Sequence, residues 1–243
     1  MGKVYVVPFL MYLLGTNAAS RFEGTSYAIA YAVVVCIVAG YLAYCYTDWK
    51  DSLKPALPSP SERKSSPSRK TKTWQRILVG GLVGIIGIIL WIAICELSLE
   101  KKLFEFFPSW LRPSERVGFN PFEEFAGSGT FVIWSFITVR MFGLAVVVPV
   151  MEELFWRGFL IRWFIDSEWR NVPIGTYSLS SSAMITLLFT LAHPELIAAA
   201  VYCVLINALL YRTRDLLQCI VAHAASNFAL GIYVLQTGTW ELW

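Results

Sequence analysis

Residues 146–163 read VVVPVMEELFWRGFLIRW, and this stretch decides the fold. Three of its charged residues, Glu152, Glu153 and Arg157, fall within six positions and have apolar residues on both sides. A charged side chain near the centre of a bilayer costs about 2.5–3.5 kcal/mol to insert, so three uncompensated charges would cost about 8–10 kcal/mol. We therefore expect the cluster to face the interior of a bundle of membrane helices.

The composition of the whole chain agrees with a membrane protein. Of its 243 residues, 56% are hydrophobic and 15% are charged, whereas a soluble domain has about 45–50% and about 25%. The mean hydropathy is +0.57. These values exclude a disordered chain, a collagen-like fibre and a nucleic-acid-binding domain. The predicted fold class is all-α, a polytopic transmembrane helical bundle with about seven to eight membrane helices.

Changes in composition divide the chain into four predicted regions. They are N-terminal membrane helices, an interfacial segment, a helical core that holds the charged cluster, and a short tail, over residues 1–97, 98–130, 131–236 and 237–243. Residues 1–20 are interpreted as a short membrane helix, with a cleaved signal peptide as the alternative.

Charge patterning predicts which loops are cytoplasmic. The loop 48–76 carries eight Lys or Arg residues against three acidic residues. Arg212 and Arg214 lie between the last two apolar runs. Cytoplasmic loops of membrane proteins are enriched in basic residues, so both loops are predicted to lie in the cytoplasm.

Small residues in the apolar runs are assigned to helix packing. Gly80, Gly81, Gly84 and Gly87 lie on closely spaced turns and are expected to let neighbouring helices approach. The five cysteines have no metal-binding or disulfide spacing, and we expect all of them to be buried small hydrophobes: Cys36, Cys45, Cys95, Cys203 and Cys219.

Helix geometry separates the two adjacent glutamates. Glu153 lies four residues before Arg157, which is the favourable order for an ion pair on a helix, and the pair is expected to be buried. Glu152 is turned about 100° away from that face and has no cation nearby in the sequence. A carboxylate without such a partner is suited to act as a general base. The alternative is that both glutamates only hold helices together.

The chain has two histidines, and both lie in apolar segments. His193 ends the sequence FTLAH, one turn after Phe189, and His223 begins HAASN, one turn before Asn227. A carboxylate and an imidazole can hold and deprotonate a water molecule. An imidazole and an amide can stabilise the oxyanion of a tetrahedral intermediate. Because intramembrane polar groups must find partners, these side chains are predicted to line one cavity with Glu152.

Other hydrolytic chemistries lack their motifs in this sequence. It contains no HExxH, no GxSG accompanied by a histidine, and no pair of intramembrane aspartates. Ser226 has no evident base on its own helix face and is assigned to packing. No cofactor is predicted, although a zinc site made of Glu152, His193 and His223 stays open as an alternative.

Three motifs carry a resemblance to a known family. EELFWR at 152–157 matches EExxxR, FTLAH at 189–193 matches FxxxH, and HAASN at 223–227 matches HxxxN. In this order they resemble the CAAX prenyl endopeptidase and bacteriocin-processing family, the CPBP or Abi proteins, over about residues 131–236. The surrounding sequence is similar to a bacterial subgroup, the CAAX prenyl protease-related proteins that accompany exosortase and exopolysaccharide systems.

The resemblance implies an intramembrane endopeptidase that acts without a metal on a membrane-associated protein or peptide. Glu152 and His193 would activate the water, and His223 and Asn227 would form the oxyanion site. The supporting residues would be Glu153, Arg157 and Phe189. The location implied is the inner membrane of a bacterium, with the lipid bilayer and an exosortase-type envelope system as partners and no nucleic acid.

Two other functions could use the same buried residues. One is a non-catalytic assembly or immunity factor for cell-envelope export. The other is a transporter with a buried proton relay, although the repeated halves with matching broken helices that are common in transporters are not evident. Loss of activity in a folded Glu152→Ala variant would separate the enzyme from the assembly factor.

Overall fold

The computed structural model describes residues 2–56, 72–106 and 118–243. Its regular elements are helices throughout these ranges, as the sequence predicts. Among the described residues, five helices are long and apolar enough to cross a membrane, which identifies an integral membrane protein. They are α2 (Gly24–Tyr44), α5 (Thr73–Glu96), the continuous helix Thr130–Trp163, α12 (Leu196–Thr213) and α13 (Leu216–Thr237).

Shorter helices complete the bundle. The apolar helices are α1 (Lys3–Ala19) and α11 (Leu179–Leu191), and the small ones are α3 (Tyr46–Trp49), α6 (Leu99–Phe104) and α7 (Pro121–Glu124). Helix α1 covers the first apolar run, and α6 and α7 lie in the segment expected at the interface. Most of the predicted basic loop, residues 57–71, lies outside the described residues.

The helix Thr130–Trp163 contains two wide π turns. In chain order its parts are α8 (Thr130–Phe142), the π segment Gly143–Val147, α9 (Val148–Glu153), the π segment Leu154–Leu160 and α10 (Ile161–Trp163). Such turns are often found at functional sites. Pro149 follows the first π segment, and its lack of an N–H removes a helical hydrogen bond at this point.

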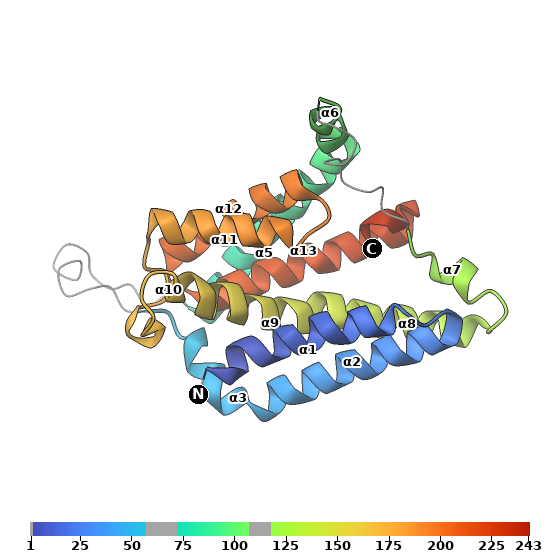
Figure 1. Ribbon diagram of the computed structural model, residues 1–243, viewed down its shortest axis with the longest axis horizontal. Helices are drawn as coiled ribbons and strands as arrows, with labels where there is room; N and C mark the ends of the chain where they lie inside the picture. The colour runs from blue at the N-terminus through green and yellow to red at the C-terminus, as the bar shows by residue number, and fades with distance from the viewer. Residues whose placement is uncertain (1, 57–71, 107–117) are drawn as a thin grey trace.

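Helix α13 lies at the centre of the bundle. It packs against α5, α12, α9 and the first π segment. Figure 1 shows it between the helix Thr130–Trp163 on one side and α5, α11 and α12 on the other, with α1 and α2 beyond α9. Polar side chains of α13 are therefore removed from lipid and can meet those of α9.

Close packing of α5 on α13 depends on glycine. A Cβ at Gly84 would collide with the backbone of Ala222, and Cβ atoms at Gly80 and Gly87 would also meet neighbouring helices. The expected close approach is therefore present at these three positions. The prediction of close approach is wrong for Gly81, where a Cβ would meet nothing within 4 Å. Helix α5 is apolar on all sides, so the sequence does not show which glycines face the bundle.

One end of the bundle joins the two loops that were predicted to be cytoplasmic. The Ala56 N–H donates to the Arg214 carbonyl at 2.9 Å. The Arg76 guanidinium donates to both carboxylate oxygens of Asp215, at 2.6 and 2.8 Å. The described ends of the basic loop and the α12–α13 turn therefore lie on the same side, as the charge pattern predicts.

The five cysteines differ in exposure. Cys45, Cys203 and Cys219 are buried, as expected, whereas Cys95 is partly exposed. Cys36 of α2 is exposed, so the prediction of burial is wrong for it. A membrane helix can present an apolar side chain to lipid, and hydrophobicity alone does not place that side chain in the core.

Candidate active site

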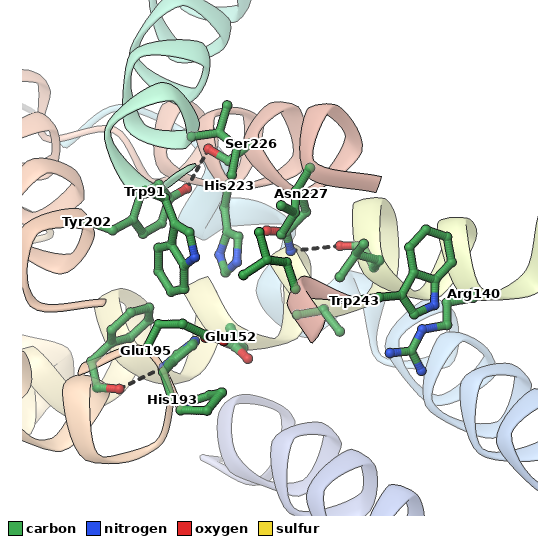
Figure 2. Close-up of a pocket in the computed structure, with 17 residues that line it drawn as sticks. Trp91, Arg140, Glu152, His193, Glu195, Tyr202, His223, Ser226, Asn227 and Trp243 are labelled. Carbon is green, nitrogen blue, oxygen red and sulfur yellow. Dashed lines mark hydrogen bonds between the residues drawn. The ribbon is translucent and has the colours of Figure 1, made fainter. Parts of the chain in front are cut away.

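One pocket brings together the polar side chains that the sequence indicated. It is lined by Glu152 of α9, His193 from the turn after α11, and His223 and Asn227 of α13, with Phe189 beside them. In the view of Figure 2, Glu152 lies between the rings of the two histidines. The predicted convergence of these side chains on one cavity is confirmed.

The two glutamates have the different surroundings that helix geometry predicts. Glu153 is fully buried, and its Oε1 accepts a hydrogen bond from Arg157 Nη1 at 3.1 Å. Arg157 is also fully buried and donates from Nε to Asn207 Oδ1 at 3.1 Å. The Oε2 atoms of Glu152 and Glu153 are both buried without a hydrogen-bond partner among the described residues, but only Glu152 lines the pocket. Glu152 therefore keeps an oxygen atom available to a ligand or a water molecule.

Glu153 has a second partner that the sequence did not predict. Its Oε1 lies 2.9 Å from Nδ1 of His223, across 70 positions of sequence. An ionised carboxylate can only accept a hydrogen bond, so Nδ1 of His223 is the donor and Nε2 is the ring nitrogen left for other contacts. No local pattern signals this contact, because it depends on how α13 packs against α9.

His193 is fixed by the residue one turn before it. Its Nδ1 lies 2.7 Å from the Phe189 carbonyl oxygen, and its ring stacks on the Phe189 ring with centroids 4.2 Å apart. Because a carbonyl oxygen only accepts, Nδ1 carries the hydrogen and Nε2 of the neutral ring is an acceptor. The FxxxH spacing therefore sets both the orientation and the tautomer of His193.

Asn227 fills a gap in the hydrogen bonds of the helix that carries Glu152. Its Nδ2 donates to the Leu144 carbonyl at 2.9 Å. In the i→i+5 pattern of a π turn, the donor to Leu144 would be residue 149, and Pro149 has no N–H. The amide of Asn227 takes that place and keeps a second N–H for other partners. In the sequence, Pro149 indicates a helix carbonyl without its backbone donor, but not which side chain takes that place.

Other lining residues were not identified from the sequence. They include the aromatic and charged side chains of Trp91, Arg140, Glu195, Tyr202 and Trp243. Ser226 also lines the pocket, and its hydroxyl lies 2.9 Å from Tyr202 Oη and 2.8 Å from the Gly84 carbonyl oxygen. These contacts agree with the packing role assigned to Ser226.

The described residues contain no group of three or more His, Cys, Asp or Glu side chains placed to hold a metal ion. Glu152, His193 and His223, the alternative zinc ligands, therefore do not form such a group in this structure.

The comparisons with known proteins concern this same region. No curated protein and no solved structure matches the chain. The segment that matches a family model begins in α8 and ends in α13, and it contains every pocket side chain described above except Trp91 and Trp243. It does not distinguish the bacterial subgroup within the family. Residues 134–229 match the family model of the type II CAAX prenyl endopeptidase Rce1-like proteins.

Proposed function

We propose that this protein is an intramembrane endopeptidase that hydrolyses a peptide bond of a membrane-associated protein or peptide. The observation that carries the proposal is the Glu152 carboxylate, which has an unpaired buried oxygen and shares a pocket with His193, His223 and Asn227. The match to an endopeptidase family over residues 134–229 supports the same chemistry. By resemblance, the membrane is the inner membrane of a bacterium.

Glu152 and His193 activate the water in this proposal. The Glu152 carboxylate and Nε2 of His193 both accept hydrogen bonds, so together they can hold one water molecule by its two hydrogens. Glu152 takes a proton as the water oxygen attacks the carbonyl carbon of the substrate. The same proton then passes to the leaving amine as the peptide bond breaks, and Glu152 returns to its starting state.

His223 and Asn227 stabilise the oxyanion in this proposal. The second N–H of the Asn227 amide is one donor, and Nε2 of a His223 ring protonated on both nitrogens is the other. Glu153 accepts from Nδ1 of His223 and is itself held by Arg157. The EExxxR motif thus supplies the base through its first acid and positions an oxyanion donor through its second.

The test compares Glu152→Gln with the wild-type protein in cells and in lipid nanodiscs. New protein termini are identified by proteomics in cells, and cleavage of a resulting candidate substrate is then measured with purified protein. Because an amide cannot accept the proton of water, we expect Glu152→Gln to lower the cleavage rate by about 10²–10⁴-fold. Its melting temperature should stay close to that of the wild type.

Glu123→Gln is the matched control, because Glu123 is exposed on α7, outside the pocket. It should leave cleavage unchanged. If Glu152→Gln processes the same termini as the wild type, the proposal fails and a non-catalytic role in envelope assembly becomes the better account.

A further inference from the structure

Arg140 is a charged residue of the pocket that the proposed mechanism does not use. It lies within the apolar helix Thr130–Trp163 and is half-buried. Its Nη1 donates to Tyr27 Oη at 3.2 Å, and its guanidinium carbon lies 5.4 Å from the centre of the Tyr31 ring and 5.6 Å from that of the Trp243 ring. All three partners are neutral side chains.

Two other arginines of the bundle have acidic partners, whereas the buried Arg162 donates to the carbonyl oxygens of Gly158 and Val172. Arg157 is paired with Glu153, and Arg76 with Asp215. Among the described residues, no carboxylate lies within ion-pair distance of Arg140. An arginine inside a membrane span is costly and usually marks a functional site. Its unused charge therefore indicates that an anionic group of a ligand comes to this end of the pocket.

The helix connects this cation to the proposed catalytic base along one wall. Arg140, Leu144, Val148 and Glu152 follow one another at intervals of four residues, and all four line the pocket. In a regular α-helix, twelve residues would turn Glu152 by about 120° away from Arg140. The intervening π segment has a wider turn, which keeps both on the same wall. Figure 2 shows Arg140 beside Trp243, away from the two histidines.

The wall between the two charged residues is long and apolar. Twelve helical residues correspond to about 18 Å along the axis, and Leu144 and Val148 lie between Arg140 and Glu152 on this wall. This arrangement suits an elongated ligand that carries an anionic group at one end.

The depth of Arg140 argues against a lipid headgroup as its partner. The midpoint of the helix Thr130–Trp163 lies between residues 146 and 147, so Arg140 is about 10 Å from it along the axis. The hydrocarbon half-thickness of a bilayer is about 15 Å. A helix centred in the membrane would place Arg140 inside the hydrocarbon, below the lipid phosphates.

We propose that Arg140 binds a carboxylate of the peptide substrate at the end of the pocket away from the two histidines and the bond that is cleaved (Figure 2). This inference rests on the proposed function for the position of the cleaved bond. The carboxylate belongs either to the end of the substrate chain or to an acidic side chain near it. Arg140 is thus a specificity-determining residue, and it places the substrate backbone along the wall that leads to Glu152.

The test measures peptide binding separately from cleavage. The probes are fluorescein-labelled peptides of alternating alanine and leucine that end in a free carboxylate, in an amide, or in aspartate amide. Their binding is followed by fluorescence anisotropy in phosphatidylcholine nanodiscs, with Glu152→Gln present in every variant to prevent turnover. Arg140→Gln, Arg140→Lys and Arg212→Gln are compared in this background. Arg212 is exposed on α12 outside the pocket and is the matched control.

We expect the free-acid peptide to bind at least about tenfold more tightly than the amide, as is typical for a charge-assisted hydrogen bond. Arg140→Gln should remove this difference, Arg140→Lys should keep part of it, and Arg212→Gln should leave it unchanged. If the aspartate amide binds like the free acid, any carboxylate satisfies the site. If it binds like the plain amide, the site selects the chain terminus.

Three results would overturn the inference. The first is equal affinity for acid and amide, the second is a preference that persists in Arg140→Gln, and the third is no binding of the acid peptide to folded protein. Phosphatidylglycerol can also be added to the nanodiscs. If it changes peptide binding only when Arg140 is present, and the acid peptide is not preferred over the amide, Arg140 binds a lipid headgroup instead. If the acid preference holds but the wild type cleaves no peptide, the proposed function fails and the carboxylate site stands.

Discussion

Glu152 and Glu153 are neighbours in the chain, yet the same substitution should affect them differently. Glu153→Gln leaves the fully buried Arg157 charge without its partner, which typically costs about 3–5 kcal/mol. Glu152→Gln breaks no ion pair, because no cationic side chain lies within ion-pair distance of Glu152 among the described residues. We therefore expect a large fall in melting temperature for Glu153→Gln and little change for Glu152→Gln, measured in the same detergent.

Cleavage assays on the two variants complete this comparison. Glu152→Gln should be folded and inactive, whereas Glu153→Gln should lose activity through instability and through loss of its contact with His223. A stable and inactive Glu153→Gln protein, beside an active Glu152→Gln protein, would show that the roles of the two acids are exchanged.

At the scale of single residues, local contacts could be predicted and distant ones could not. The Glu153–Arg157 pair follows from helix spacing, and it is present. The contacts of Glu153 with His223 and of Asn227 with Leu144 join separate helices. They depend on how α13 sits against α9, which no spacing within one helix defines. The catalytic roles of Glu152 and the histidines stay predictions.

Among the helices, the α5–α13 contact offers a matched pair of glycines. Gly84→Ala would place a Cβ against the backbone of Ala222, and overpacking typically costs about 1–3 kcal/mol. Gly81→Ala meets open space and removes a glycine from a helix, which is neutral or stabilising by up to about 1 kcal/mol. Melting temperatures should therefore fall for Gly84→Ala and stay level or rise for Gly81→Ala.

The reverse order of melting temperatures would mean that α5 packs through another face. This result would also question the position of Ser226, whose hydroxyl contacts the Gly84 carbonyl.

Hydropathy predicts where the helices lie but not their irregularities. The apolar runs mark α2, α5, α12 and α13 closely. The first π segment of the helix Thr130–Trp163 precedes Pro149 and accepts a hydrogen bond from a side chain of α13. Periodicity alone reveals neither this segment nor the second one. The position of Arg140 in the pocket depends on the same feature.

For the whole molecule, the charge pattern predicts which end of the helical bundle faces the cytoplasm. Arg212 lies at the end that joins the two basic loops, and Glu123 lies on α7 beyond the other end of α5. In a background with Cys36→Ala and Cys95→Ala, which removes the two cysteines that are not buried, Arg212→Cys should react with a membrane-impermeant maleimide only after the cells are opened. Glu123→Cys should react in intact cells, because basic loops are retained in the cytoplasm. Labelling of Arg212→Cys in intact cells would reverse the topology.

The helical class of the fold, and the loops that share one end of the bundle, could be predicted from the sequence. The reason is that hydropathy and charge act on whole segments. The helical class is confirmed, and the described parts of the two basic loops share one end. The order in which helices pack could not be predicted, since all apolar faces of membrane helices look alike in sequence. The central place of α13 is therefore a finding of the structure.

The hydrogen bond from Asn227 to Leu144 has a consequence for biosynthesis. A ribosome makes α9 well before α13, so a partly made chain carries Glu152 before His223 and Asn227 exist. During that interval the Leu144 carbonyl lacks its side-chain donor, and the pocket lacks the wall that α13 supplies. Under the proposed function, a nascent chain is therefore unable to cut its neighbours in the translocation machinery, and proteolytic competence arises when the helix carrying Asn227 has been inserted.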